Sequence, residues 1–294
     1  MVADQLTPIE GIRRELRRNI RGYLTGSSES RGSVSPARDG WFGPDSMTWL
    51  IQSDWSTIIG GVESLFMQTL HPPTMAGVAD HSDYEHDPFG RLHRTAQFIG
   101  ATTFGSADDA QRSVDMVRAI HSRVNGTTPE GTAYEANDPH NLAWVHITEV
   151  DGFLRAYRRF GAVDIDDGQA DQYVAEMARI GEAMGVERAP RNVSELDSRI
   201  DSYRPELRYG AQAREAVRFL LFPPHSWQAR GPYAIVLSAA VNLLPAWARR
   251  KLWLPPTIPP IDRLVVAPAA KAMVSTIDWI MDNPNVSNIR ARSL

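Results

Sequence analysis

Residues 114–124 read Val-Asp-Met-Val-Arg-Ala-Ile-His-Ser-Arg-Val, and their spacing decides the predicted fold. At 3.6 residues per turn, one helical face of this segment is apolar except for a single imidazole. Ser106-Ala-Asp-Asp109 caps the start of the helix that carries this segment, and Gly126 ends it. We therefore predict a helix that buries a histidine. The residues of its apolar face are Val114, Val117, His121 and Val124.

The composition is that of a globular protein with a sizeable core. The chain has 294 residues, of which 43% are hydrophobic and 22% are charged. It has no cysteine, which excludes disulfides, thiolate nucleophiles, iron–sulfur clusters and zinc–thiolate sites. Any metal must therefore be held by His, Asp, Glu, Tyr or a cofactor. The net charge of −4 gives no reason to expect a nucleic-acid partner.

Neither the N-terminal residues nor the longest apolar run predicts a membrane anchor. Residues 1–5 lack the charged and apolar regions of a signal peptide. The longest apolar run, at about 234–248, is interrupted by Asn242 and Pro245 and is shorter than the roughly 20 residues that span a bilayer. We expect a cytoplasmic protein without a transmembrane segment, which contacts a membrane at most peripherally.

The pattern predicts an all-α fold, with about ten helices in a single globular domain. No run alternates like a strand over a useful length, and no repeat of fixed period is present. An arginine-rich helix near 7–23 and a Gly/Ser/Pro-rich linker occupy residues 1–46, and the linker ends in Trp41-Phe42, which we expect to dock on the main domain at 47–294. Besides the segment around His121, helices are predicted at about 55–70, 89–104, 138–160, 166–184, 194–203, 211–221, 230–249 and 262–282.

His121 is the best candidate for an iron ligand. A neutral imidazole on a rigid helix is the usual proximal ligand of haem iron. Arg118, one turn earlier, is placed to hold a haem propionate or another carboxylate. The competing interpretation is a core histidine whose ring nitrogens bond to neighbouring groups, which is the commoner situation for a lone histidine on an apolar face.

A basic cluster precedes this helix. Arg91, Arg94 and Thr95 share a face at spacings of three and four residues. Arginines on a helix that also buries apolar side chains either extend to the surface or pair with buried anions. We treat the three as candidate catalytic residues.

A second histidine on an apolar face lies in the predicted helix 138–160. His146 and Glu149 form a His-x-x-Glu pair there. We count His146 as a further cofactor-binding candidate. The pair also allows a non-haem iron site with His121, to which Glu63 would add a carboxylate, although the Glu-x-x-His motifs of di-iron bundles are absent. The simplest alternative is a buried pair that orients a neighbouring helix.

The order of several short motifs resembles the bacterial and fungal family that contains latex-clearing protein and the MpaB-type oxygenase of the mycophenolate pathway. The likeness covers about residues 50–250. The motifs are Leu70-His-Pro72, Gly77-Val-Ala-Asp-His-Ser82, Asp87-Pro-Phe-Gly-Arg91-Leu-His-Arg-Thr95, Phe104-Gly105, His121, Asp138-Pro139 and Trp144-Val-His-Ile-Thr148.

The resemblance implies a globin-reminiscent helical fold that binds haem b and oxidises an apolar substrate with dioxygen. It assigns the proximal histidine to His121 and its neighbouring arginine to Arg118. It assigns the distal residues to Arg91, Arg94 and Thr95, with arginine at the middle position in place of a lysine that can bind iron. Because arginine stays protonated, Arg94 cannot do the same. The family's proposed catalytic glutamate has no confident counterpart here.

The sequence thus supports three hypotheses. The leading one is a haem-b-dependent oxygenase or related oxidoreductase for a small or medium apolar substrate, such as an isoprenoid. The second is a non-haem iron oxygenase that uses His121, His146 and Glu149. The third is a helical protein that binds haem or an apolar ligand without turnover.

Overall fold

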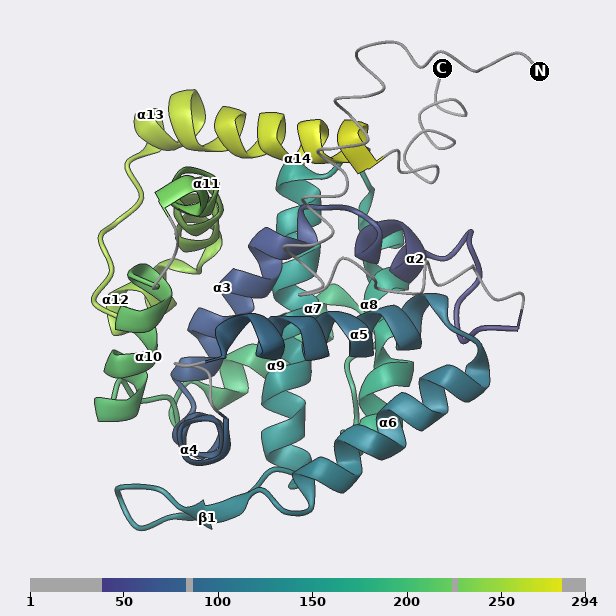
Figure 1. The fold of residues 1–294 in the computed structure, drawn as a ribbon, viewed down its shortest axis with the longest axis vertical. Coiled ribbons are helices and arrows are strands. Elements are labelled where there is room, and N and C mark those ends of the chain that lie inside the picture. The colour runs from purple at the N-terminus through teal and green to yellow at the C-terminus, as the bar shows by residue number, and fades with distance from the viewer. Residues whose placement is uncertain (1–38, 83–86, 224–226, 282–294) are drawn as a thin grey trace, which may run out of the picture.

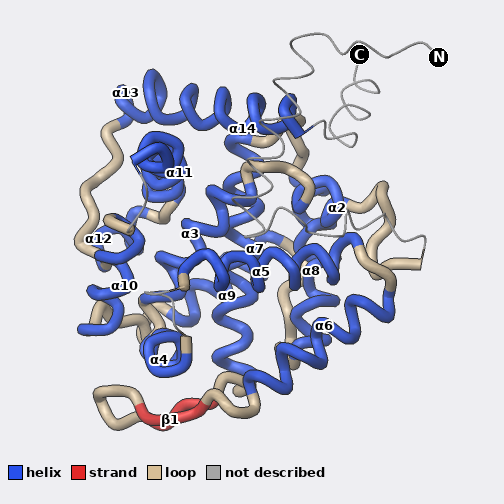
Figure 2. The backbone as a smooth tube through the Cα atoms, in the orientation of Figure 1, coloured by secondary structure: helices blue, strands red, loops and turns tan. Residues whose placement is uncertain are grey.

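The computed structural model describes residues 39–82, 87–223 and 227–281, and in these ranges the regular secondary structure is helical apart from one small hairpin. The arginine-rich helix expected near 7–23 lies outside the described residues. Figures 1 and 2 show α7 running through the middle of the molecule, with the other helices around it. The elements that precede α7 are α2 (Met47–Gln52), α3 (Thr57–Thr69), α4 (Pro72–His81), α5 (Pro88–Phe104), α6 (Ala107–His121), β1 (Asn125–Thr127) and β2 (Ala133–Glu135).

The elements from α7 onward complete the all-α fold that the sequence predicts. They are α7 (Pro139–Phe160), α8 (Asp167–Met184), α9 (Val193–Tyr203), α10 (Ala211–Leu221), α11 (Trp227–Leu243), α12 (Ala246–Lys251), α13 (Pro259–Ile261), the π-helical turn η1 (Asp262–Val266) and α14 (Ala267–Met281).

The central helix α7 begins and ends where the sequence predicts. The Asp138 carboxylate accepts hydrogen bonds from the backbone N–H groups of His140 and Asn141, and Pro139 takes the first helical position. Gly161 ends the helix. Fourteen of the residues of α7 are buried, so its sides pack on several neighbours at once. This helix is the core element against which the rest of the fold is placed.

Helix α3 crosses α7 at a pair of glycines. A Cβ atom added to Gly60 would lie 2.4 Å from the carbonyl oxygen of Gly152, and one added to Gly152 would lie 2.6 Å from that of Gly60. The two backbones therefore touch directly, and no side chain larger than hydrogen fits between them. Ile59, Phe66 and Met67 of α3 are fully buried beside the crossing.

Helix α6 ends earlier than the sequence suggests. Ser106 and Asp109 form the predicted capping box, but the last helical residue is His121, not one near Gly126. Gly126 instead lies in β1, where it pairs with Tyr134 of β2, and a Cβ atom there would lie 2.8 Å from the Tyr134 hydroxyl oxygen. The sequence pattern, in which no run alternates like a strand over a useful length, did not predict this short hairpin.

The C-terminal helical stretch is one candidate span that the expectation of no transmembrane segment did not consider. Residues 259–281 are long and apolar enough by length and composition alone, with a mean hydropathy of 1.4, and 22% of the tested window is buried. The run at 234–248 that looked longest is divided at Pro245 into α11 and α12. Figure 1 shows α13 and α14 in one line along an edge of the molecule.

The end of the linker docks on the main domain, as expected. Phe42 is buried, and Trp41 packs against the core. The Arg179 guanidinium of α8 donates a 2.8 Å hydrogen bond to the Trp41 carbonyl oxygen and lies 5.0 Å from the centre of the Trp41 ring.

Candidate functional site

His121 is half-buried at the C-terminal end of α6. Burial lowers the pKa of its imidazole below the ordinary value. The ring is therefore neutral near pH 7, which is the form that binds iron. Its Nδ1 atom is buried and has no hydrogen-bond partner among the described residues. A buried ring nitrogen without a partner fits a residue whose ligand is a bound group.

Arg118 lies one turn before His121 and ties α6 to its neighbours. Its guanidinium donates a 3.2 Å hydrogen bond to the Ala183 carbonyl oxygen near the end of α8. Its own carbonyl oxygen accepts a 3.0 Å hydrogen bond from the Asn137 side chain. The side chain is exposed, so the guanidinium retains further donors for an anion such as a propionate.

The three candidates on α5 differ in exposure and in the groups that they contact. Arg94 is 61% exposed and pairs with Asp87 at 3.5 Å. Thr95 is exposed and donates its hydroxyl to the Arg91 carbonyl oxygen at 3.2 Å. Arg91 is half-buried, and its guanidinium acts electrostatically on Glu149 of α7. Arg91 is thus the member of the cluster that the structure connects to a buried polar group of the central helix.

His146 and Glu149 lie one turn apart on α7. Burial lowers the pKa of His146 to about 4, and its ring packs on α8 at Gly181, where an added Cβ atom would lie 2.8 Å from Nε2. Burial raises the pKa of Glu149 to about 7, although the Arg91 guanidinium opposes this rise. The Tyr173 ring of α8 lies within electrostatic range of Glu149. The carboxyl group can therefore gain or lose a proton near neutral pH.

Glu63 is on α3 and faces α7 at Gly152, away from the His146–Glu149 turn. Its side chain is fully buried, with one carboxylate oxygen against Gly152. Burial and the nearby Asp151 raise the pKa of Glu63 well above the ordinary value, while Arg155 lowers it. Arg155 pairs with Asp151 at 2.7 Å. Burial thus favours the protonated form of Glu63 beside this ion pair. Its described surroundings contain Asp151 and Arg155 and neither of the histidines that the non-haem hypothesis combines with it.

A cluster of possible metal ligands joins the end of α3, the start of α7 and the turn after α9. The ligand atoms of His71, His140 and Glu206 all lie within 4.8 Å of one another. The Nε2 atom of His140 is 2.8 Å from Glu206 Oε2, and that of His71 is 3.9 Å from it. His71 is buried, whereas the other two are exposed. Burial lowers the pKa of His71 to about 4, which keeps its imidazole neutral.

The sequence did not predict the cluster of His71, His140 and Glu206. His71 belongs to the Leu70-His-Pro72 motif and His140 to the predicted start of a helix, but neither received a role. Sixty-six residues separate His140 from Glu206. No local spacing therefore signals the cluster, which depends on how α3, α7 and α9 pack.

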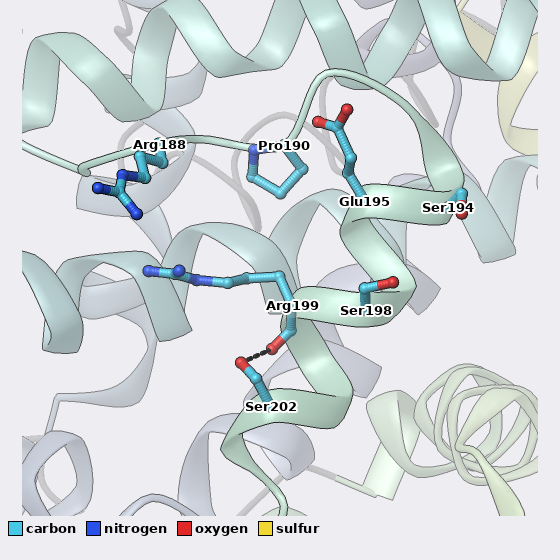
Figure 3. A pocket seen from close by; sticks show the side chains of 7 residues that line it. All are labelled: Arg188, Pro190, Ser194, Glu195, Ser198, Arg199 and Ser202. Atoms are coloured by element: carbon cyan, nitrogen blue, oxygen red, sulfur yellow. Dashed lines mark hydrogen bonds between the residues drawn. The ribbon is translucent and has the colours of Figure 1, made fainter.

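An open groove lies along α9. Figure 3 shows it between this helix and the loop that carries Arg188 and Pro190. Its volume is about 350 Å³, and Arg188 and Arg199 extend along it in the same direction. The lining residues are Arg188, Pro190, Ser194, Glu195, Ser198, Arg199 and Ser202. All are on α9 or just before it, and none is a candidate from the sequence.

Comparison with protein families gives a match over most of the chain. A family model described as the catalytic domain of the ER-bound oxygenase mpaB/B' and rubber oxygenase matches residues 49–279, which is most of the chain. Neither a curated protein nor a solved structure matches.

Proposed function

The chain belongs to the mpaB/rubber oxygenase catalytic-domain family, and on this premise we propose that it is a haem-b-dependent oxygenase for a small or medium apolar substrate, such as an isoprenoid. The observation that carries the haem assignment is His121, a neutral imidazole on α6 whose buried ring nitrogen has no hydrogen-bond partner within the described ranges. When bound, haem iron supplies the redox chemistry that activates dioxygen.

The side chains around His121 would perform separate tasks. His121 would hold the iron, and the exposed Arg118 guanidinium would pair with a propionate. Arg91 would provide positive charge beside α7, and Arg94 and Thr95 would offer further hydrogen-bond donors from α5. His146 would contribute a neutral, buried ring to the cofactor pocket.

Glu149 adds a group that the sequence did not assign to proton transfer. Its carboxyl group has a pKa of about 7, close to the value that suits a general acid or base at neutral pH. Arg91 lies within electrostatic range of it. We expect Glu149 to hold or move the proton that oxygen chemistry requires, in place of the family's glutamate, for which this sequence has no confident counterpart.

Absorbance spectroscopy tests the haem assignment. Protein reconstituted with haem should show a Soret band, and His121→Ala should bind haem at least about tenfold more weakly. His81→Ala is the matched control, because His81 is an exposed histidine at the end of α4. Equal haem affinity in His121→Ala and wild type would refute the assignment.

Two further measurements separate the rival functions. Iron without porphyrin, lost in Glu149→Gln and retained in Arg118→Ala, would favour a non-haem oxygenase. Dioxygen uptake with a panel of terpenoids and unsaturated lipids, above the His121→Ala background, would exclude a protein that only binds its ligand.

The α13–α14 stretch suggests how an apolar substrate reaches the protein. Its two acidic residues, Asp262 and Asp278, are buried, whereas its two cationic residues, Arg263 and Lys271, are exposed. Large apolar side chains are exposed on the same stretch, with Leu264 at 77%. Apolar and cationic groups together suit an anionic lipid surface. We therefore expect this face to lie on a membrane that contains acidic lipids.

A further inference from the structure

We propose that His71, His140 and Glu206 form a binding site for a divalent transition-metal ion of the zinc class, with water in the remaining coordination positions. None of the three is a residue of the proposed haem site. Two imidazoles and one carboxylate are a ligand set that zinc and neighbouring transition metals accept. The sequence has no cysteine, so a site of nitrogen and oxygen ligands is also the type that this chain can build.

The spacing of the ligand atoms suits one ion. Ligands about 2.0–2.1 Å from a tetrahedral metal lie about 3.3 Å apart. The two nitrogen-to-carboxylate distances here, 2.8 Å for His140 and 3.9 Å for His71, lie on either side of that value. Glu206 is 46% exposed, so a shift of its side chain by about half an ångström can equalise them. The ion would replace the proton of the hydrogen bond between His140 and Glu206.

A second ring of contacts already orients the ligands. Nδ1 of His71 lies 2.8 Å from the Thr74 hydroxyl oxygen, which leaves Nε2 to face Glu206. The His140 ring stacks on Tyr203 at 4.4 Å, and the Tyr203 hydroxyl donates a 2.8 Å hydrogen bond to the His140 carbonyl oxygen. Metal-binding histidines usually have such a partner on the second ring nitrogen. The imidazoles are therefore fixed before any ion arrives.

The site also has the required charge and access. His71 is buried and approaches from inside, while His140 and Glu206 are 47% and 46% exposed and leave the outer side open to water. Asp138 lies within electrostatic range of His71 and adds negative charge. A bound cation would join α3, α7 and the turn after α9 through side chains alone.

Titration of the full chain, freed of metal with a chelator, tests the proposal directly. Zn²⁺ should bind with a stoichiometry of one by calorimetry, and Co²⁺ should give visible d–d absorption of a four- or five-coordinate ion. Glu206→Gln and His140→Ala should each weaken Zn²⁺ binding at least tenfold, and both positions are exposed, so the fold should survive. Thr74→Val should weaken it about tenfold through the lost contact with His71.

The controls distinguish this site from general histidine binding and from the haem assignment. His81→Ala should bind Zn²⁺ like wild type, and the Soret band of reconstituted Glu206→Gln should be unchanged. Absence of one-to-one binding in the wild type, or affinity retained in both Glu206→Gln and His140→Ala, would overturn the metal site whatever the haem measurement shows.

Discussion

The glycine contact between α3 and α7 makes a sharp prediction from two adjacent positions. In Gly60→Ala the new Cβ atom would lie 2.4 Å from the Gly152 carbonyl oxygen, about 1 Å inside ordinary contact. That oxygen belongs to a helix backbone and cannot rotate away, so the helices must separate. In Gly61→Ala the nearest atom is Cε1 of the Phe153 ring at 3.6 Å, which is an ordinary contact.

The energies follow from this difference. Replacing glycine by alanine inside a helix stabilises it by about 1 kcal/mol. At Gly60 overpacking costs about 3 kcal/mol, which leaves a net loss of about 2 kcal/mol. At Gly61 the gain remains. The two variants should therefore differ by about 3 kcal/mol in the free energy of unfolding.

Urea unfolding followed by circular dichroism measures this difference. Gly61→Ala should unfold at a higher urea concentration than wild type and Gly60→Ala at a lower one, with similar slopes. Gly100→Ala is a second control, because no atom lies within 4 Å of its added Cβ atom. If Gly60→Ala is as stable as Gly61→Ala, the two backbones do not touch at this point and the described crossing is wrong.

Three further predictions concern buried charge and the exposed helix. His146 has a folded pKa of about 4, below the 6.5 of the unfolded chain, so its contribution is complete above pH 6.5 and is lost as pH falls. Urea unfolding should show that the wild type loses about 3 kcal/mol of unfolding free energy between pH 7 and pH 4, and that His146→Leu does not. An equal loss in His146→Leu would contradict this assignment. Glu63 has a raised folded pKa, so wild type loses stability as pH rises above 4.5, and the gain from Glu63→Gln should grow with pH; a constant gain would exclude ionisation as the cause. Leu264→Glu should abolish sedimentation with vesicles that contain phosphatidylglycerol, whereas Met116→Glu, at a 64% exposed position on α6, should not; light scattering that shows a dimer instead would assign the face to a second copy.

The sequence predicted correctly those features that depend on residues close together in the chain, such as the ends of helices. The capping box at Ser106, the Asp138-Pro139 start of α7 and the Gly161 end are all confirmed. Each depends on side chains and backbone groups within a few residues. The docking of Trp41-Phe42 is also confirmed, because aromatic side chains in a polar linker have few alternatives to burial on the core.

The long-range features could not be read from the sequence in the same way. A glycine such as Gly126 often follows the end of a helix. Here the position requires glycine because a larger residue would collide with the Tyr134 side chain across the hairpin. The periodicity around 230–249 ignores the break that Pro245 makes. His121 was predicted to be buried and is half-buried, while Arg94 and Thr95, predicted from their shared face, are exposed. A helical face gives direction around one axis but says nothing of which helix covers it.

The contact between Gly60 and Gly152 also fixes the point where α3 and α7 cross. From this crossing α3 runs toward His71 at its C-terminal end, and α7 runs back toward His140 at its N-terminal end. The angle between the two helices therefore determines how the two imidazoles are placed. At 1.5 Å per residue, His140 lies about 18 Å from the crossing. A change of only about 3° in the crossing angle would move His140 by about 1 Å, which is half the length of a metal–nitrogen bond. The smallest residues of the chain therefore set how precisely two distant rings meet.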